Sequence, residues 1–204
     1  NPYWDLYKNS NKSDKDVFRF TAKAIYNIDS HLKIQGTIGT DINNMNFQDY
    51  IARTTPGKSA GQLQESVFQN RTLNAEILAL YNNQFGDFDV NATLGGNIYK
   101  VDNKTNILTG LGQQMKDVIA IMNYQEQSVQ QNTYKKQINS IYGSASIGYD
   151  HTYYLEGTLR GDKSSTLPVN NNTYVYPSVS ASWVFSEYLK NKNIINYGKF
   201  RASW

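Results

Sequence analysis

The chain of 204 residues contains no cysteine, which excludes a disulfide framework and any metal site built on thiolates. It also lacks an apolar run of about 18 residues, so we expect no transmembrane helix. This second absence leaves a membrane β-barrel open, because barrel strands carry apolar residues only at alternate positions. The net charge is small, at +3 from 20 basic and 17 acidic residues, and gives no indication of nucleic-acid binding.

The two ends of the sequence lack the marks of a complete precursor. The first residues, "NPYWDLYKNS", contain no basic segment followed by an apolar core, so we expect no signal peptide. The last residues, "YGKFRASW", stop in the middle of an alternating pattern. We therefore expect a mature piece or a fragment of a longer protein.

Aromatic and small polar residues are abundant. Aromatic residues make up 13% of the chain, with 16 tyrosines, and Asn, Ser, Thr and Gln fill much of the remainder. This composition favours strands over helices. In segment 17–28, apolar residues from Phe18 to Ile28 alternate with residues such as Arg19 and Lys23, which is the period of a strand with one apolar face.

The same alternation recurs along the chain and predicts an all-β antiparallel meander. We expect eight strands, at 17–28, 32–42, 67–81, 88–100, 134–149, 153–162, 174–186 and 199–204. Segment 67–81 is the least regular, and a helix is the alternative there. We expect one face to point outward to lipid, and its members include Phe18, Phe20, Ala22, Ala92, Leu94, Ala145, Ile147, Val179 and Ala181.

The predicted connections alternate in length. Short ones lie near 29–31, 82–87 and 150–152, and long ones near 43–66, 101–133 and 163–173, with a short helix expected within 109–131. In an antiparallel meander all the long connections fall at one end, as in outer-membrane barrels with short periplasmic turns and long extracellular loops. A soluble sandwich has no reason to keep this asymmetry.

The polar face favours a wide barrel. Its Ser, Thr, Asn and Gly residues suit a hydrated lumen, whereas a soluble sheet usually exposes many Lys and Glu residues. A closed barrel of eight strands leaves an interior just wide enough for packed side chains. We expect an open arc instead, because this face carries several long residues: Arg19, Lys23, Lys33, Gln35, Glu156, Arg160 and Arg201.

Three segments resemble the SusC/RagA family of TonB-dependent outer-membrane transporters of Bacteroidota. "TLRGDKSSTLPVNNNTYVYPSVSASWVFSE" is similar to the family pattern Leu-Arg-x-Asp-Gly-Ser-Ser, a loop, and Tyr-Pro-Ser-x-Ser. "YLKNKNIINYGKFRASW" resembles the next turn and strand, which ends in Lys-x-Arg-Ala-Ser-Trp. "NPYWDLYKNS" resembles the Asn-Pro-Tyr-Trp element before a strand. Lys163 departs from the pattern, because the family usually has Gly there.

The resemblance implies that residues 1–204 form part of a transmembrane barrel of about 22 strands. The plug and amino-terminal domains would be absent from this chain. The whole protein would import oligosaccharides or peptides across the outer membrane, with energy relayed by TonB and with a SusD-like surface lipoprotein as partner. It would be neither an enzyme nor dependent on a cofactor, since no bond is made or broken.

Two other functions remain open. One is a small self-contained outer-membrane barrel with a structural or adhesin role, because eight strands can close by themselves. The other is a barrel enzyme, which would need a Ser/His/Asp constellation. Finding a plug domain upstream in the same open reading frame would favour the importer.

Individual residues give no catalytic, cofactor-binding or metal site, and the ligand-binding residues stay unknown. His31 and His151 fall in short turns without a second ligand at metal spacing. Arg160-Gly161-Asp162 matches an adhesion tripeptide but falls on a strand rather than a loop tip, and Gly95-Gly96 indicates a close backbone approach or a bend. The ligand candidates are suggested by position alone: Phe47, Tyr50, Phe68 and Tyr124.

Overall fold

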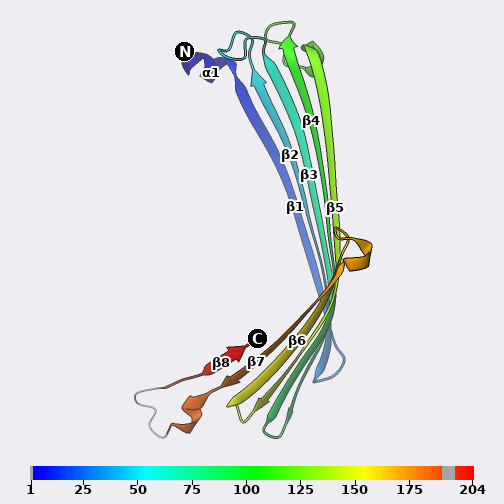
Figure 1. Cartoon of the computed structure of the whole chain (residues 1–204), viewed down its shortest axis with the longest axis vertical. Coiled ribbons are helices and arrows are strands. Elements are labelled where there is room, and N and C mark those ends of the chain that lie inside the picture. The colour runs from blue at the N-terminus through cyan, green and yellow to red at the C-terminus, as the bar shows by residue number, and fades with distance from the viewer. Residues whose placement is uncertain (1, 190–195) are drawn as a thin grey trace. The chain divides into compact units, whose positions relative to one another are not determined.

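The computed structural model describes residues 2–189 and 196–204. Its eight strands form one sheet, in which each strand pairs with its neighbours in chain order (Figure 1). The strands are β1 (Ser10–Asn27), β2 (Leu32–Ile51), β3 (Gln62–Phe85), β4 (Phe88–Gln113), β5 (Tyr124–Tyr149), β6 (Tyr153–Ser164), β7 (Thr173–Trp183) and β8 (Phe200–Ser203). Within the described residues β1 and β8 are the two edges, so the predicted open all-β meander is confirmed.

Helical structure is limited to short pieces. The described residues contain one α-helix, α1 (Pro2–Lys8), which precedes β1, and three 3₁₀ turns in connections: η1 (Ile121–Asn123), η2 (Val169–Asn171) and η3 (Phe185–Tyr188). The helix alternative for 67–81 is wrong, because this segment lies within β3. The short helix expected within 109–131 is reduced to η1. No helix of the described residues has the length and apolar character needed to cross a membrane.

Strands β2 to β5 are much longer than predicted, with 20, 24, 26 and 26 residues. The predicted long loops at 43–66 and 101–133 are therefore mostly strand, and the connections shrink to 52–61 and 114–123. The alternation is lost in these segments because their few apolar residues fall on both faces, as Phe47 and Tyr50 do on β2 and Ile107 and Leu108 do on β4. The hydrogen bonds between strands do not depend on side-chain polarity.

The remaining connections are close to the prediction. The turns at 29–31 and 150–152 are present, the turn at 82–87 narrows to 86–87, and 163–173 narrows to 165–172. Lys163 pairs with Thr173, so the strand continues past the position where the family pattern has Gly. Strand β7 ends three residues before the predicted limit of 186, at Trp183. Part of the connection from β7 to β8 lies outside the described residues.

The chain divides into two compact units. The first comprises Asn1–Phe20, Thr40–Thr72 and Lys100–Lys135. Its core is a cluster of buried residues at the ends of β2, β3 and β5, formed by Tyr50, Ala52, Leu63 and Tyr124. Asn123 organises the 114–123 connection, since its side-chain amide donates to the carbonyls of Met115 at 2.7 Å and Val118 at 2.8 Å.

The second unit comprises Thr21–Gly39, Leu73–Tyr99 and Lys136–Trp204. Its turn between β1 and β2 is held by Asp29, whose Oδ1 accepts hydrogen bonds from the backbone N–H of His31 at 2.7 Å and of Leu32 at 2.8 Å. These bonds favour the ionised carboxylate and lower the pKa of Asp29, with the bond from His31 contributing most.

Candidate functional site

The paired strands of the second unit separate two chemically distinct faces. On one face Ile147 pairs with Leu155, Leu155 with Ala181, and Ala181 with Ala202. On the other face Ser146 pairs with Glu156, and Glu156 with Ser180. We call these the apolar face and the polar face. The register of the strands pairs apolar residues with apolar residues and polar residues with polar residues, as expected when the two faces of a sheet have different surroundings.

Side-chain contacts extend the polar face across the other strands. In the first unit, Arg19 on β1 lies with its Nε 2.5 Å from Asp41 Oδ1 on β2, and Thr72 Oγ1 on β3 donates to Asp41 Oδ2 at 3.5 Å. In the second unit, Asn97 on β4 donates to Asn74 Oδ1 on β3 at 2.6 Å. Because side chains alternate along a strand, the residues flanking Arg19 (Phe18 and Phe20) lie on the apolar face.

A hydrogen-bonded network lies on the polar face of the second unit. The hydroxyl of Tyr142 on β5 donates to Glu76 Oε1 on β3, across the intervening strand β4. Arg160 on β6 places its guanidinium carbon 5.2 Å from the centroid of the Tyr142 ring, and its Nη2 donates to Ser140 Oγ at 3.0 Å. The network therefore joins side chains of three strands, β3, β5 and β6, and spans β4.

The Arg160-Gly161-Asp162 tripeptide is part of this network. It lies within β6, and Arg160 Nε donates to the Asp162 carboxylate at 2.9 and 3.1 Å. Because both charged side chains are paired with each other in mid-strand, the tripeptide is not presented at a loop tip. The expectation that it lies on a strand is confirmed.

Gly95 makes the Tyr142–Glu76 contact possible. A Cβ atom built at Gly95 would lie 2.5 Å from Cε2 of Tyr142 and 2.7 Å from Cδ2 of Leu78. The ring of Tyr142 thus crosses β4 directly over the glycine, and the predicted close backbone approach is confirmed. At Gly96, on the opposite face, the nearest atom would be Ser140 O at 3.7 Å, which is ordinary contact.

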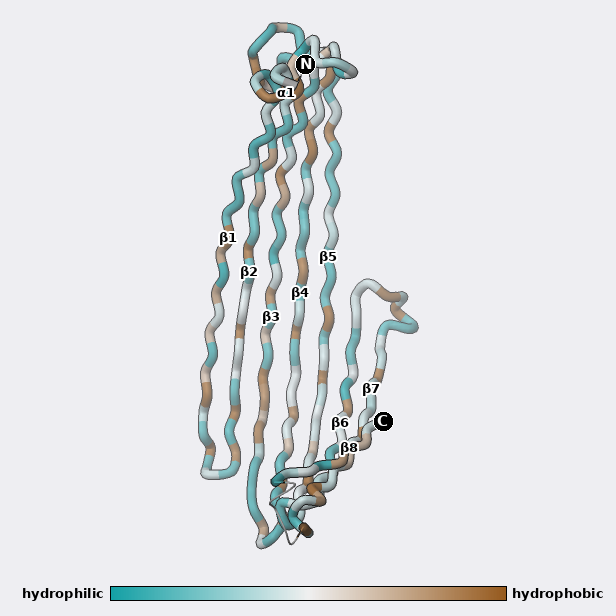
Figure 2. The backbone as a smooth tube through the Cα atoms, turned by 90° about the vertical axis from the view of Figure 1, so that its left-hand side faces the viewer, coloured by the Kyte–Doolittle hydropathy of each residue, from teal (hydrophilic) through white to brown (hydrophobic). Residues whose placement is uncertain are grey.

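The apolar face is exposed, and within the described residues no second sheet covers it. Leu94 is 61% exposed, Phe18 58% and Val179 52%. Figure 2 shows the apolar and polar residues alternating along the strands. Apolar residues occupy this face over a limited stretch of each long strand: Phe18–Tyr26, Leu32–Ile42, Leu73–Tyr81, Phe88–Ile98 and Ile141–Tyr149. We call these stretches the apolar band.

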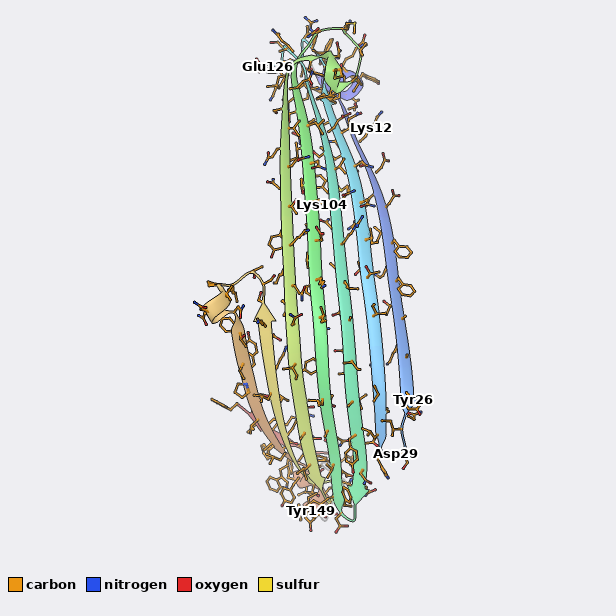
Figure 3. The ribbon with its side chains drawn as sticks, turned by 90° about the vertical axis from the view of Figure 1, so that its right-hand side faces the viewer. Lys12, Tyr26, Asp29, Lys104, Glu126 and Tyr149 are labelled. Atoms are coloured by element: carbon orange, nitrogen blue, oxygen red, sulfur yellow. The ribbon has the colours of Figure 1, made fainter. Side chains whose placement is uncertain are left out.

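Beyond the band, the same alternate positions become polar or charged. Strand β1 carries Asp14 and Asp16 before Phe18, and β4 carries Lys100 and Lys104 after Ile98. Figure 3 labels Lys104 on β4 and Tyr149 at the end of β5. The length of the band, about 9–11 residues, equals the length of strand that crosses a bilayer.

Aromatic rings gather at the short-turn end of the band in the second unit. The rings of Phe88 and Tyr149 lie 4.8 Å apart between centroids, and the ring of Trp183 lies 6.5 Å from Tyr153 and 6.2 Å from Phe200. Amphipathic rings in a row at the end of an apolar band are typical of the aromatic girdle of a membrane barrel.

The four ligand candidates suggested by position lie on β2, β3 and β5. Tyr50 and Tyr124 are buried in the core cluster, where burial raises the pKa of Tyr124 to about 12. Phe47 lies within β2, although the sequence predicts a loop there, and Phe68 lies within β3. Phe47, Tyr50 and Tyr124 fall in predicted loops that are mostly strand, whereas Phe68 falls in the predicted strand 67–81.

Each of the two histidines has one polar contact from its ring. His31 Nδ1 lies 3.1 Å from the carbonyl oxygen of Asn82, and His151 Nδ1 lies 3.2 Å from Asp89 Oδ2. Among the residues that the structure describes, no three possible ligands gather around a metal position.

The face on which the charged residues next to the band lie is not predicted from the sequence. The available signal is the switch from apolar to charged residues at unchanged spacing of two, between Asp16 and Phe18 and between Ile98 and Lys100. Because those segments read as loops, their side chains receive no assignment to a face.

No protein-family model and no curated protein matches this chain. Solved structures do match. A structure of the RagAB peptide transporter aligns with a TM-score of 0.84 at 16% identity, over 91% of this chain and 21% of that chain. The RagAB peptide importer in its "closed-closed" and "open-open" states aligns with a TM-score of 0.86 at 15% identity, over 99% of this chain and 23% of that chain. At this identity the likeness establishes the fold, which is an open portion of a larger barrel.

Proposed function

We propose that the chain is a wall segment of a TonB-dependent importer in the outer membrane of a Gram-negative, Bacteroidota-like bacterium. The observation that carries the proposal is the width of the apolar band. Strand β4 has 26 residues and is roughly 85–90 Å long, yet the continuous apolar stretch of this face ends at Ile98 and is followed by Lys100, Asp102, Lys104 and Asn106. A bilayer core of about 30 Å accounts for this limit, whereas burial against another protein layer has no reason to stop there.

The open strand order supports a segment of a larger barrel over a self-contained one. Edge strands β1 and β8 leave unpaired backbone groups, which the membrane does not tolerate unless further strands complete the wall. The resemblance to the SusC/RagA family, with its barrel of about 22 strands, and the fold of the RagAB importer both support this interpretation.

The polar face would line the lumen. Its side chains hydrogen-bond to one another in rows, as between Thr158 Oγ1 and Ser178 Oγ at 2.6 Å, and such a surface suits the passage of hydrated solutes. The cargo would be a peptide, as in the RagAB importer, or an oligosaccharide, as the family resemblance also allows. A SusD-like lipoprotein would close the mouth, and TonB would act through parts outside this chain. No covalent chemistry is involved.

Limited proteolysis of intact cells tests the proposal. The connections 52–61, 114–123 and 165–172 would face outward, so added protease cuts there and spares 28–31 and 150–152. Cell fractionation provides the control, because the protein should sediment with outer membranes. Cleavage at the short turns of sealed cells would reverse the orientation, and a protein found entirely in the soluble fraction would overturn the proposal. A plug domain encoded upstream would separate the importer from a small self-contained barrel.

A further inference from the structure

Basic residues gather on the apolar face just beyond the band, on three neighbouring strands. Lys100 and Lys104 on β4 continue the alternate positions of Leu94 and Ile98, and Lys135 on β5 continues those of Ile141 and Ile147. Arg71 on β3 precedes Leu73 by the same spacing of two. We call Arg71, Lys100, Lys104 and Lys135 the basic cluster. All four belong to the first unit and are exposed.

Side-chain contacts fix the side of the sheet on which these residues lie. Lys135 Nζ on β5 lies 3.9 Å from Asp102 Oδ2 on β4, so these two side chains share a face. Lys100 and Lys104 flank Asp102 at a spacing of two and share that face as well. Arg71 adjoins Thr72, whose hydroxyl reaches Asp41 on the polar face, and it therefore points to the opposite side.

The charge of this surface stays positive. Asp102 is the acidic residue between Lys100 and Lys104, whereas Glu65 lies on this face of β3 three alternate positions from Arg71. The ion pair of Asp102 with Lys135 is long and exposed, with side-chain exposures of 69% for Lys135 and 40% for Asp102. Such pairs neutralise little. The neighbouring positions on the same face, Gln69, Asn106, Gln137 and Asn139, are neutral. Strand β1 differs, because Asp14 and Asp16 occupy the corresponding positions beyond its band.

We propose that the basic cluster binds the phosphate groups of lipid headgroups in the leaflet nearest the long loops. The inference rests on the proposed membrane position of the band. A row of cations that directly follows a lipid-facing apolar stretch lies at headgroup depth, where anionic phosphates attract Lys and Arg. Arg71 adds a guanidinium that forms paired hydrogen bonds with phosphate oxygens. The occupant is the phosphorylated headgroup of a lipid in that leaflet.

The test is lipid retention by the complete protein, purified in detergent and measured by native mass spectrometry. The probes are phosphorylated lipid A and the same lipid treated with phosphatase. Removing one basic residue near a membrane surface weakens attraction about fivefold. The triple variant Arg71→Gln, Lys100→Gln, Lys104→Gln should therefore bind phosphorylated lipid roughly a hundredfold more weakly, and the dephosphorylated lipid as the unchanged protein does.

Two matched variants sharpen the test. Lys136→Gln removes the same charge next to Lys135 but on the polar face, and its lipid retention should change less than about twofold. Asp102→Asn removes the opposing carboxylate and should increase retention of phosphorylated lipid. This variant loses no basic residue, so a gain cannot be attributed to misfolding.

Membrane insertion is measured separately, by sedimentation with outer membranes and by heat-modifiable migration on a gel. If the protein inserts but the triple variant keeps phosphorylated lipid as well as Lys136→Gln does, the headgroup inference is overturned while the proposed function stands. Equal retention of both lipid forms by the unchanged protein would also overturn the headgroup inference alone. If the unchanged protein does not insert at all, both proposals are overturned.

Discussion

Along β4, two segments of one strand present different chemistry on the same face. From Phe88 to Ile98 the alternate positions are apolar, and from Lys100 to Asn106 they are charged or polar. The strand itself is continuous through Gln113. The backbone hydrogen bonds between strands form equally well beside lipid and beside water. The polarity of the side chains, in contrast, has to match the surroundings of each segment. The change at Lys100 therefore indicates where the proposed bilayer ends, and it does not indicate where the strand ends.

The polar face carries paired polar side chains in both units. In the first unit it carries the Arg19–Asp41 pair, and in the second it carries the Tyr142–Glu76 contact and the Asn97–Asn74 hydrogen bond. Paired polar side chains on one face, opposite a face that changes from apolar to charged residues, are what we expect of a bilayer around a hydrated lumen.

The largest expected effect comes from a charge placed inside the band. Ala92→Arg should destabilise the membrane-inserted protein by about 2–4 kcal/mol, because a guanidinium near the bilayer midplane loses its hydration. The measurement is the free energy of unfolding by denaturant in lipid vesicles. Asn106→Arg provides the control on the same face and strand beyond the band, and Thr93→Arg provides it on the polar face. Both should cost far less than Ala92→Arg. Equal costs at Ala92 and Thr93 would refute the assignment of the faces.

The next effect concerns how the polar face is built. Gly95→Ala should cost about 1–3 kcal/mol, because the new methyl group overlaps the ring of Tyr142 and both must shift. Gly96→Ala, where the new atom makes ordinary contact, should be neutral or stabilise by up to about 1 kcal/mol.

A double-mutant cycle isolates the contact at Gly95. In a Tyr142→Ala background the methyl group meets a smaller neighbour, so most of the cost of Gly95→Ala should disappear. The same cost in both backgrounds would mean that Tyr142 is not what excludes a side chain at Gly95, and the explanation of the close approach would be wrong.

The smallest effect is at a turn outside the band. The folded pKa of Asp29 is lowered by hydrogen bonds from the backbone N–H of His31 and Leu32. The contribution of the ionised Asp29 carboxylate to folding stability is therefore present above the ordinary aspartate pKa of about 3.9. This contribution is lost as the pH falls through the lower pKa of the folded state. Asp29→Ala should speed hydrogen exchange of these two amides at neutral pH, with no change at the 150–152 turn. Unchanged exchange would contradict the role of Asp29.

The band was readable from the sequence because one face is apolar and the other polar. Phe18 and Phe20 flank Arg19, and Leu94 lies beside Thr93, so the period of two is visible. The same holds for the antiparallel order, since the turns at 29–31 and 150–152 are short enough to join only adjacent strands.

The parts of the long strands beyond the band could not be predicted, because they lack one apolar and one polar face. Between Lys100 and Gln113 most residues are polar and the few apolar ones fall on both faces, as Ile107 and Leu108 do, so nothing in the side-chain pattern distinguishes a strand from a loop. The contact of Tyr142 with Glu76 was equally hidden, because it joins strands that are not adjacent and depends on the register at Gly95. Sequence spacing within one strand carries no information about that register.

The most direct test of the membrane position is a depth profile along β4 of the complete protein in a bilayer. The chain contains no cysteine, so single cysteines placed at each position from 88 to 113 can carry a spin label. Accessibility to oxygen, which partitions into lipid, is then compared with accessibility to a water-soluble nickel chelate. We expect high oxygen accessibility at even positions from 88 to 98 and a change to chelate accessibility from 100 to 106, with odd positions never accessible to lipid. Two results would contradict the proposed band. One is the same oxygen and chelate accessibility at even positions before and after Lys100, and the other is no difference between even and odd positions from 88 to 98.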